Sequence, residues 1–302
     1  MKILIAFLLI GSALTSFGQT SIQHLKKGNA RAKLNDNKGA LAEYTKALVI
    51  DPTNSVAYFK RGDIKYKMQD LPGAIDDFGK AIEINKTYLE AYVYRATVRT
   101  ETKDFAGAVS DYDFVITAKP TDIDSYLKRG AAKKELKNLP GALADFNFVL
   151  SVAPTNDAAF ASRADVKNDM KDYNGAMDDC NKAISLNPKN TDAYMERGLS
   201  KYYLKSYQAA IADYNFVIEN DPDNGIVYFN RGLAKVNLYD YRGAILDCDK
   251  ALEFNPKWAD VFSLRGDMKL VIKDKEGACV DWSKAGALGR ADAYDKIKKN
   301  CN

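Results

Sequence analysis

The chain has 302 residues and a formal net charge of +4, which comes from 44 basic and 40 acidic residues interspersed along its length. Such mixing is typical of a solvated surface and argues against a basic stripe for nucleic acid. The single histidine, His24, leaves little material for a multi-histidine metal site or a histidine-based catalytic triad.

Residues 1–18 have the three parts of a secretory signal peptide. Lys2 supplies a positive start, an apolar core follows, and Ser16 and Gly18 are small residues placed for a cut before Gln19. The alternative, a buried N-terminal helix, would break the capping order of the segments that follow. No later stretch approaches the roughly 18 apolar residues needed to cross a bilayer. We therefore expect an exported protein, periplasmic or extracellular, with no integral membrane segment.

After this leader the sequence repeats every 34 residues. Glycine or alanine holds position 8 of every copy, and alanine holds position 20. A fixed period of this length indicates one supersecondary unit, copied and stacked on its neighbours. The eight copies span residues 21–54, 55–88, 89–122, 123–156, 157–190, 191–224, 225–258 and 259–292.

Each copy is predicted to form two amphipathic helices, helix A and helix B. Positions 4, 8 and 11 share one helical face, and positions 20, 24 and 27 share another. Position 16 is Asp, Asn or Ser in every copy, which are residue types that cap helix N-termini. Proline at position 32 ends helix B in six copies. A short terminal helix from Ala291 to Asn300 is expected within a C-terminal capping segment, residues 291–302.

The pattern resembles that of the tetratricopeptide repeat (TPR) family, with an aromatic residue at position 4, small residues at 8 and 27, alanine at 20, an aromatic residue at 24 and proline at 32. The resemblance covers the whole chain after the leader. It implies an all-α fold, a right-handed α–α superhelix (a TPR solenoid) of eight helix–turn–helix repeats plus a C-terminal capping helix. Two positions depart from the family pattern: position 7 is arginine instead of leucine in seven copies, and position 11 is basic instead of tyrosine.

The four cysteines separate into two kinds. Cys180 and Cys248 hold position 24 in copies two repeats apart, too far for a disulfide, so we interpret them as small apolar core residues. Cys279 lies near the start of the last helix B, and Cys301 ends the terminal helix. Antiparallel packing would bring these two together, and for an exported protein we favour a disulfide over two free thiols.

A charged trio recurs with the repeat: arginine at position 7, a base at position 11 and an acid at position 23. Positions 7 and 11 lie on one face of helix A, among packing positions, where charges need a partner. We interpret the trio as a structural ion-pair ladder between the two helices, in preference to a ligand site. It is represented by Arg61 with Asp77, Arg129 with Asp145, and Arg197 with Asp213.

The resemblance also implies a groove lined by positions 2, 5, 9, 12 and 13 of helix A. These positions are mostly polar and acidic in repeats 3 to 5 and apolar in repeats 6 and 7. Exposed apolar residues indicate a contact surface, although a tight superhelix or a dimer would also hide them. The predicted partner-binding residues are Met195, Leu199, Tyr202, Tyr203, Phe229, Leu233, Phe59 and Tyr66.

No phosphate-binding glycine loop occurs, and adjacent acids such as Asp76 and Asp77 follow from the repeat pattern. We therefore expect no catalytic residues, no cofactor and no metal. The leading hypothesis is a secreted, non-enzymatic module that binds a peptide or protein partner in its concave groove, with no nucleic acid. The alternative is a scaffold subunit of a cell-envelope or secretion assembly. The oligomeric state stays open.

Overall fold

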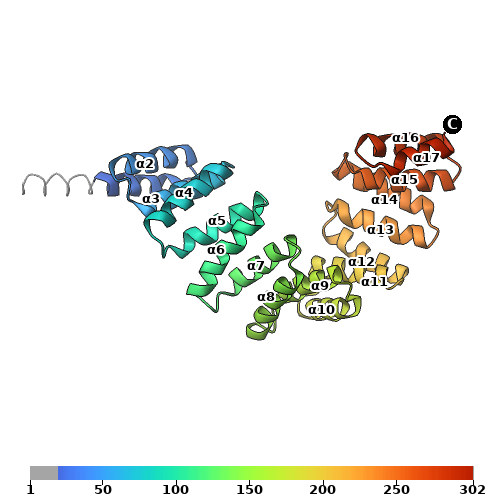
Figure 1. The fold of residues 1–302 in the computed structure, drawn as a ribbon, viewed down its shortest axis with the longest axis horizontal. Coiled ribbons are helices and arrows are strands. Elements are labelled where there is room, and N and C mark those ends of the chain that lie inside the picture. The colour runs from blue at the N-terminus through green and yellow to red at the C-terminus, as the bar shows by residue number, and fades with distance from the viewer. Residues whose placement is uncertain (1–19, 302) are drawn as a thin grey trace, which may run out of the picture. The chain divides into compact units, whose positions relative to one another are not determined.

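The computed structural model describes residues 20–301, and within that range the regular elements are all helices. The leader, residues 1–18, lies outside the described residues. Figure 1 shows the helices following one another in chain order, and each packs against the next along most of the chain. The expected all-α class, built from consecutive helix pairs as in a TPR solenoid, is confirmed.

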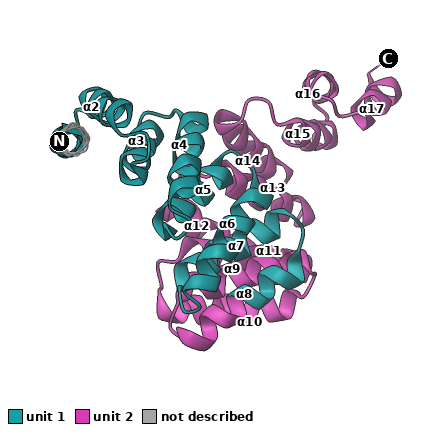
Figure 2. Cartoon of the chain, turned by 60° about the vertical axis from the view of Figure 1, so that its left-hand side comes forward, with its two compact units in different colours: residues 1–145 teal, residues 146–302 magenta. Residues whose placement is uncertain are grey.

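The chain divides into two compact units, coloured separately in Figure 2, with the boundary between Asp145 and Phe146. This boundary falls inside α8 (Leu139–Val152). The first unit begins with a helix over residues 20–33. Its later helices are α2 (Asn37–Ile50), α3 (Ser55–Lys67), α4 (Leu71–Ile84), α5 (Leu89–Glu101), α6 (Phe105–Ala118) and α7 (Ile123–Glu135).

The second unit continues the alternation of helix A and helix B and ends with the expected terminal helix, α17 (Asp292–Asn300), which packs against α16. Its other helices are α9 (Asp157–Asp169), α10 (Tyr173–Leu186), α11 (Thr191–Tyr203), α12 (Tyr207–Asn220), α13 (Gly225–Asn237), α14 (Tyr241–Phe254), α15 (Ala259–Val271) and α16 (Lys275–Ala287).

The turn from helix A to helix B has the same conformation in every repeat. Position 15 adopts a left-handed backbone with φ between 58° and 71°, and it is never glycine, as Lys171 illustrates. In six repeats an aspartate follows and caps helix B, as where the side chain of Asp172 accepts a hydrogen bond from the N–H of Gly175. The left-handed residue reverses the chain and the cap starts the next helix, so both helices of a pair are fixed locally.

Small residues at two positions set how closely the paired helices approach. Position 20 is alanine in all eight repeats and is fully buried in each, as Ala74 is. Where position 24 carries a ring, position 8 faces it: a Cβ atom built on Gly62 would lie 2.9 Å from the ring of Phe78, and one on Gly198 would lie 2.6 Å from Tyr214. Helix A therefore packs directly against the ring carried by helix B.

Candidate partner-binding surface

The charged trio forms a buried ion-pair ladder in repeats 2 to 8. Each position-23 aspartate is only 1–4% exposed. Its carboxylate accepts two bonds from the position-7 guanidinium, at 2.8–3.1 Å from Nε and 2.5–2.8 Å from Nη2. The base at position 11 adds an ion pair at 2.7–2.9 Å. The representative pairs, Arg61 with Asp77, Arg129 with Asp145 and Arg197 with Asp213, all share this geometry.

The same arginines also connect neighbouring repeats, a contact that we did not predict from the sequence. The Nη1 group of each position-7 arginine from Arg129 onward donates to position 25 of the preceding repeat, at 2.5–2.8 Å. The acceptors are Asp113, Asn147, Asn181, Asn215 and Asp249. Position 25 is Asp or Asn in five consecutive repeats, and this pattern was the signal in the sequence for the contact between repeats.

Each guanidinium also lies over the aromatic ring at position 4 of its own helix, with Cζ 5.0–5.6 Å from the ring centroid. A cation over a ring face is attracted by the ring quadrupole. The arginines are thus held by a carboxylate, a ring and, in five repeats, a neighbouring side chain. Because these groups already satisfy the guanidinium, the ladder leaves little capacity for an outside ligand.

Repeat 1 replaces the ladder with a different set of contacts. Glu43 is 7% exposed and accepts bonds from His24 at 2.7 Å and from Lys46 at 3.0 Å. These hydrogen bonds, that from His24 first, lower the pKa of Glu43 to about 2. The position-11 base, Arg31, pairs instead with Asp36 at 2.7 Å. His24 therefore joins the two helices of the first pair.

The disulfide joins the last repeat to the C-terminal helix. Cys279 and Cys301 are bonded with a Cα–Cα distance of 5.9 Å, which ties the end of α17 to α16. Cys180 and Cys248 are free and fully buried, and desolvation raises the pKa of both thiols, that of Cys248 to about 12. They occupy core positions and are not reactive surface groups.

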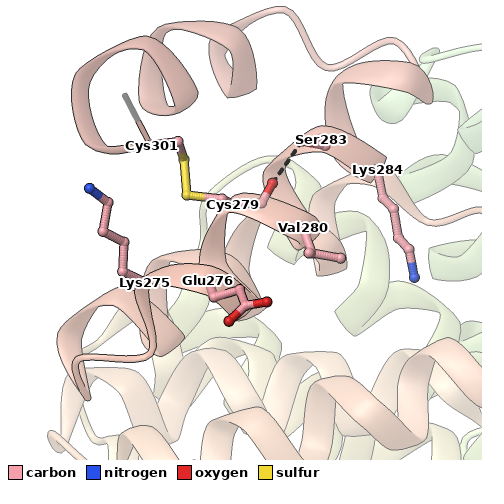
Figure 3. A pocket seen from close by; sticks show the side chains of 7 residues that line it. All are labelled: Lys275, Glu276, Cys279, Val280, Ser283, Lys284 and Cys301. Atoms are coloured by element: carbon pink, nitrogen blue, oxygen red, sulfur yellow. Dashed lines mark hydrogen bonds between the residues drawn. A yellow bond between two sulfur atoms is a disulfide. The ribbon is translucent and has the colours of Figure 1, made fainter.

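The disulfide borders a hollow of about 690 Å³ on the helix B side of the last repeat. Figure 3 shows Val280 and Glu276 between two lysines, Lys275 and Lys284, with the sulfur bridge at one side. Val280 is 49% exposed, so this hollow offers an apolar contact that is distinct from the predicted helix A surface.

Two of the predicted binding residues, both in repeat 2, are held by contacts within the fold. Phe59 is 4% exposed and packs against the rings of Phe78, Tyr88 and Tyr94 at centroid distances of 5.0–5.6 Å. Its prediction as a partner-binding residue is therefore wrong: two rings of its own repeat and Tyr94 of the next repeat cover it. The hydroxyl of Tyr66, half-buried, donates to Glu101 of the next repeat, and this bond raises the pKa of Tyr66.

In repeat 6 the predicted residues differ in exposure. Met195, Leu199 and Tyr202 are half-buried, and Met195 and Tyr202 pack against the core of the second unit. Tyr203 is 52% exposed and stacks on Tyr173 of the preceding repeat at 4.8 Å. Tyr203 is thus the most accessible of the four.

Repeats 7 and 8 enclose a hollow of about 290 Å³ that includes two predicted residues. Phe229 and Leu233 come from α13, and Leu264 lies opposite them on α15. The charged residues of this hollow are already paired. Arg290 bonds to Asp260, and Lys296 on α17 bonds to Asp267 and Ser263 at 2.7–2.9 Å. The remaining lining is mainly apolar.

A second hollow, of about 550 Å³, lies where α12 and α14 end and α13 and α15 begin. Its apolar lining is formed by Ile226, Phe254 and Trp258. Trp258 contacts Phe229 at a centroid distance of 4.9 Å, so this ring pair separates the two hollows. Together the two hollows form one surface, which we call the α13–α15 surface, and it extends from the predicted centre in repeats 6 and 7 into repeat 8.

Between residues 20 and 301 no group of three or more His, Cys, Asp or Glu side chains is arranged to hold a metal ion. Over the same residues no helix has the length and apolar character needed to cross a bilayer.

Family models describe the repeats directly. A TPR repeat model matches residues 28–69, and tetratricopeptide repeat models match residues 55–88, 158–190 and 195–257. These matches together cover just over half of the chain. No curated protein matches the sequence significantly.

Solved structures with similar folds span most of the chain. A chain in the structure of the APC/C hetero-tetramer Cut9–Hcn1 matches with a TM-score of 0.71 at 14% identity, over 92% of this chain and 55% of that one. The C-terminal part of a TPR repeat-containing protein from Cytophaga hutchinsonii has a TM-score of 0.53 at 19% identity, covering 78% and 98% of the two chains. A tetratricopeptide repeat protein from Parabacteroides merdae has 19% identity over 94% and 100%, with a TM-score of 0.49.

Repeats of this kind are generally protein-interaction modules. Four observations indicate the same family. They are the 34-residue helix pairs, the buried alanines and rings, the family-model matches and the solved structures of like fold. The chain belongs to the tetratricopeptide repeat family.

Proposed function

We propose that this protein is a non-enzymatic interaction module that binds a peptide or protein segment on the helix A side of repeats 6 to 8. The observation that carries the proposal is the α13–α15 surface, where large apolar side chains line two adjacent hollows. Ile226 and Phe254 remain 54% and 43% exposed there. Exposed apolar patches with polar surroundings are typical of protein contact sites.

The side chains of the α13–α15 surface are those of a binding site and do not form an active site's set of reactive groups. The bases next to its smaller hollow are engaged by carboxylates, and the ladder arginines are satisfied within the fold. An apolar lining with a few fixed charges supports recognition of side chains by shape and burial.

Capture of a partner by variants tests the proposal. The protein, immobilised and exposed to envelope extract, should retain a partner that mass spectrometry identifies and that binds again after purification. Ile226→Ser with Phe254→Ser should abolish this binding while leaving the melting temperature nearly unchanged, because both side chains are already exposed.

The matched control is Val49→Ser with Leu246→Ser, a pair that is 77% and 65% exposed and lies outside both hollows. This control should bind the partner normally. If the Ile226 and Phe254 variant still captures the partner with its fold intact, the α13–α15 surface is not the binding site.

A second candidate function, a scaffold subunit of an envelope or secretion assembly, is favoured by the hollow on α16. Val280 is exposed there on the helix B side of the last repeat, as a surface for a further subunit would require. The native complex should then elute at high mass in size-exclusion chromatography, and Val280→Asp should dissociate it. A chain that elutes as a monomer from native extract would contradict this function.

We also propose that the protein works outside the cytoplasm, in the periplasm or the extracellular medium. The leader composition supports export, and a disulfide between Cys279 and Cys301 suits an oxidising compartment. N-terminal sequencing of protein recovered from the periplasm or medium should begin at Gln19. An intact leader on cytoplasmic protein would contradict export.

A further inference from the structure

The larger hollow of the α13–α15 surface has two acidic side chains beside its apolar lining. Asp221 and Asp223 line it together with Ile226, Phe254 and Trp258, and there is no base among its lining residues. Both aspartates are exposed. The hollow thus presents negative charge beside apolar side chains.

These two carboxylates differ from those of the neighbouring hollow. There Asp260 pairs with Arg290 and Asp267 pairs with Lys296. Across the described chain neither Asp221 nor Asp223 forms an ion pair. Their charge is therefore available to a cation from outside, and interfaces are commonly complementary in potential.

The aromatic floor favours one kind of cation. Trp258 is half-buried and lies in the same hollow as the two carboxylates. Tryptophan is the best aromatic partner for a cation, and a guanidinium can stack on a ring while it donates paired bonds to a carboxylate. The ladder uses this same combination of ring and carboxylate for its own arginines, as Arg265 does with Phe262 and Asp281.

We propose that this hollow binds an arginine side chain of the partner segment, with a bulky apolar residue next to it in the partner's sequence. The guanidinium would lie between Trp258 and the carboxylates of Asp221 and Asp223, and the apolar neighbour would cover Ile226 and Phe254. A volume of about 550 Å³ is within the range of sites that bind small ligands. The inference rests on the proposed function and names the chemistry of the partner.

Two short peptides test the inference by isothermal titration calorimetry with the purified protein. One has the sequence Ser-Gly-Leu-Arg-Phe-Gly-Ser with blocked ends, and the other carries citrulline, the neutral isostere, in place of arginine. The arginine peptide should bind about tenfold more tightly. Asp221→Asn with Asp223→Asn should reduce this ratio to less than about twofold, because only the charge is removed.

The matched control is Asp76→Asn with Asp178→Asn, which removes the same charge from two exposed aspartates outside the hollow. It should keep the full preference for arginine. Equal binding of the two peptides, or binding of neither, overturns the inference.

The partner-capture assay separates this outcome from failure of the proposed function. If capture is lost with Ile226→Ser and Phe254→Ser but kept with the two Asp→Asn changes, the surface binds its partner without an arginine. If capture survives the apolar changes, the proposed function fails whichever peptide binds.

Discussion

The ladder makes a quantitative prediction at two adjacent residues of α10. Asp179 is 4% exposed and accepts bonds from Arg163 at 2.6 and 2.8 Å, while Lys167 pairs with it at 2.7 Å. Asp178, one residue earlier, is exposed. Asp179→Ala and Asp178→Ala therefore remove the same carboxylate group from the same helix, but only Asp179→Ala breaks the ladder.

Removing one member of a buried ion pair typically costs about 3–5 kcal/mol, because the remaining charge is left uncompensated. Here the cost should be lower, since the side chains of Arg163 and Lys167 are each 19% exposed and can be partly rehydrated. Arg163 also keeps its bond to Asn147 at 2.8 Å. We expect Asp179→Ala to lower the free energy of unfolding by about 2–3 kcal/mol and Asp178→Ala by less than about 0.5 kcal/mol.

Urea unfolding followed by far-UV circular dichroism measures both values. Hydrogen exchange should show the added opening in α9 and α10 first, because repeats contact only their neighbours. An equal loss of stability in the two variants would show that position 23 is solvated and that the ladder is not a structural element.

Three other changes test separate features. Cys301→Ser should release α17 and raise hydrogen exchange there before the rest of the chain, at a cost of about 2–3 kcal/mol; unchanged exchange in α17 would show that packing alone holds it. Gly79→Asn should raise stability by about 1 kcal/mol in urea unfolding, because it removes a helical glycine and supplies the missing position-25 acceptor for Arg95, whose Nη1 lies 3.6 Å from the place of a Cβ atom at residue 79. The lowered pKa of Glu43 means that its stabilisation is present above its ordinary pKa of 4.5 and is lost as the pH falls towards about 2. Exchange of repeat 1 should therefore rise on acidification, and Glu43→Gln should remove that pH dependence.

The binding surface shows where prediction from the sequence stopped. Phe59 and Phe229 hold the same position of their repeats, and the pattern treats them alike. In the structure Tyr94 of the next repeat packs on Phe59, whereas the residue at the same place beside Phe229 is Leu264, and a hollow opens there. Exposure depends on the side chains that the next repeat places against a residue, and a position number within one repeat does not contain that information.

The sequence by itself determined the helix pairs, their caps, the small residues that set their spacing and the ladder positions. Each of these depends on local periodicity or on a residue type that recurs every 34 residues, so eight copies reinforce one signal. Only the tertiary structure decided which arginines reach the preceding repeat, which aspartates are left without a base and where the hollows open. Those features arise between repeats, where contacts depend on the particular side chains of two neighbours and on the distances between them. The 34-residue pattern specifies neither.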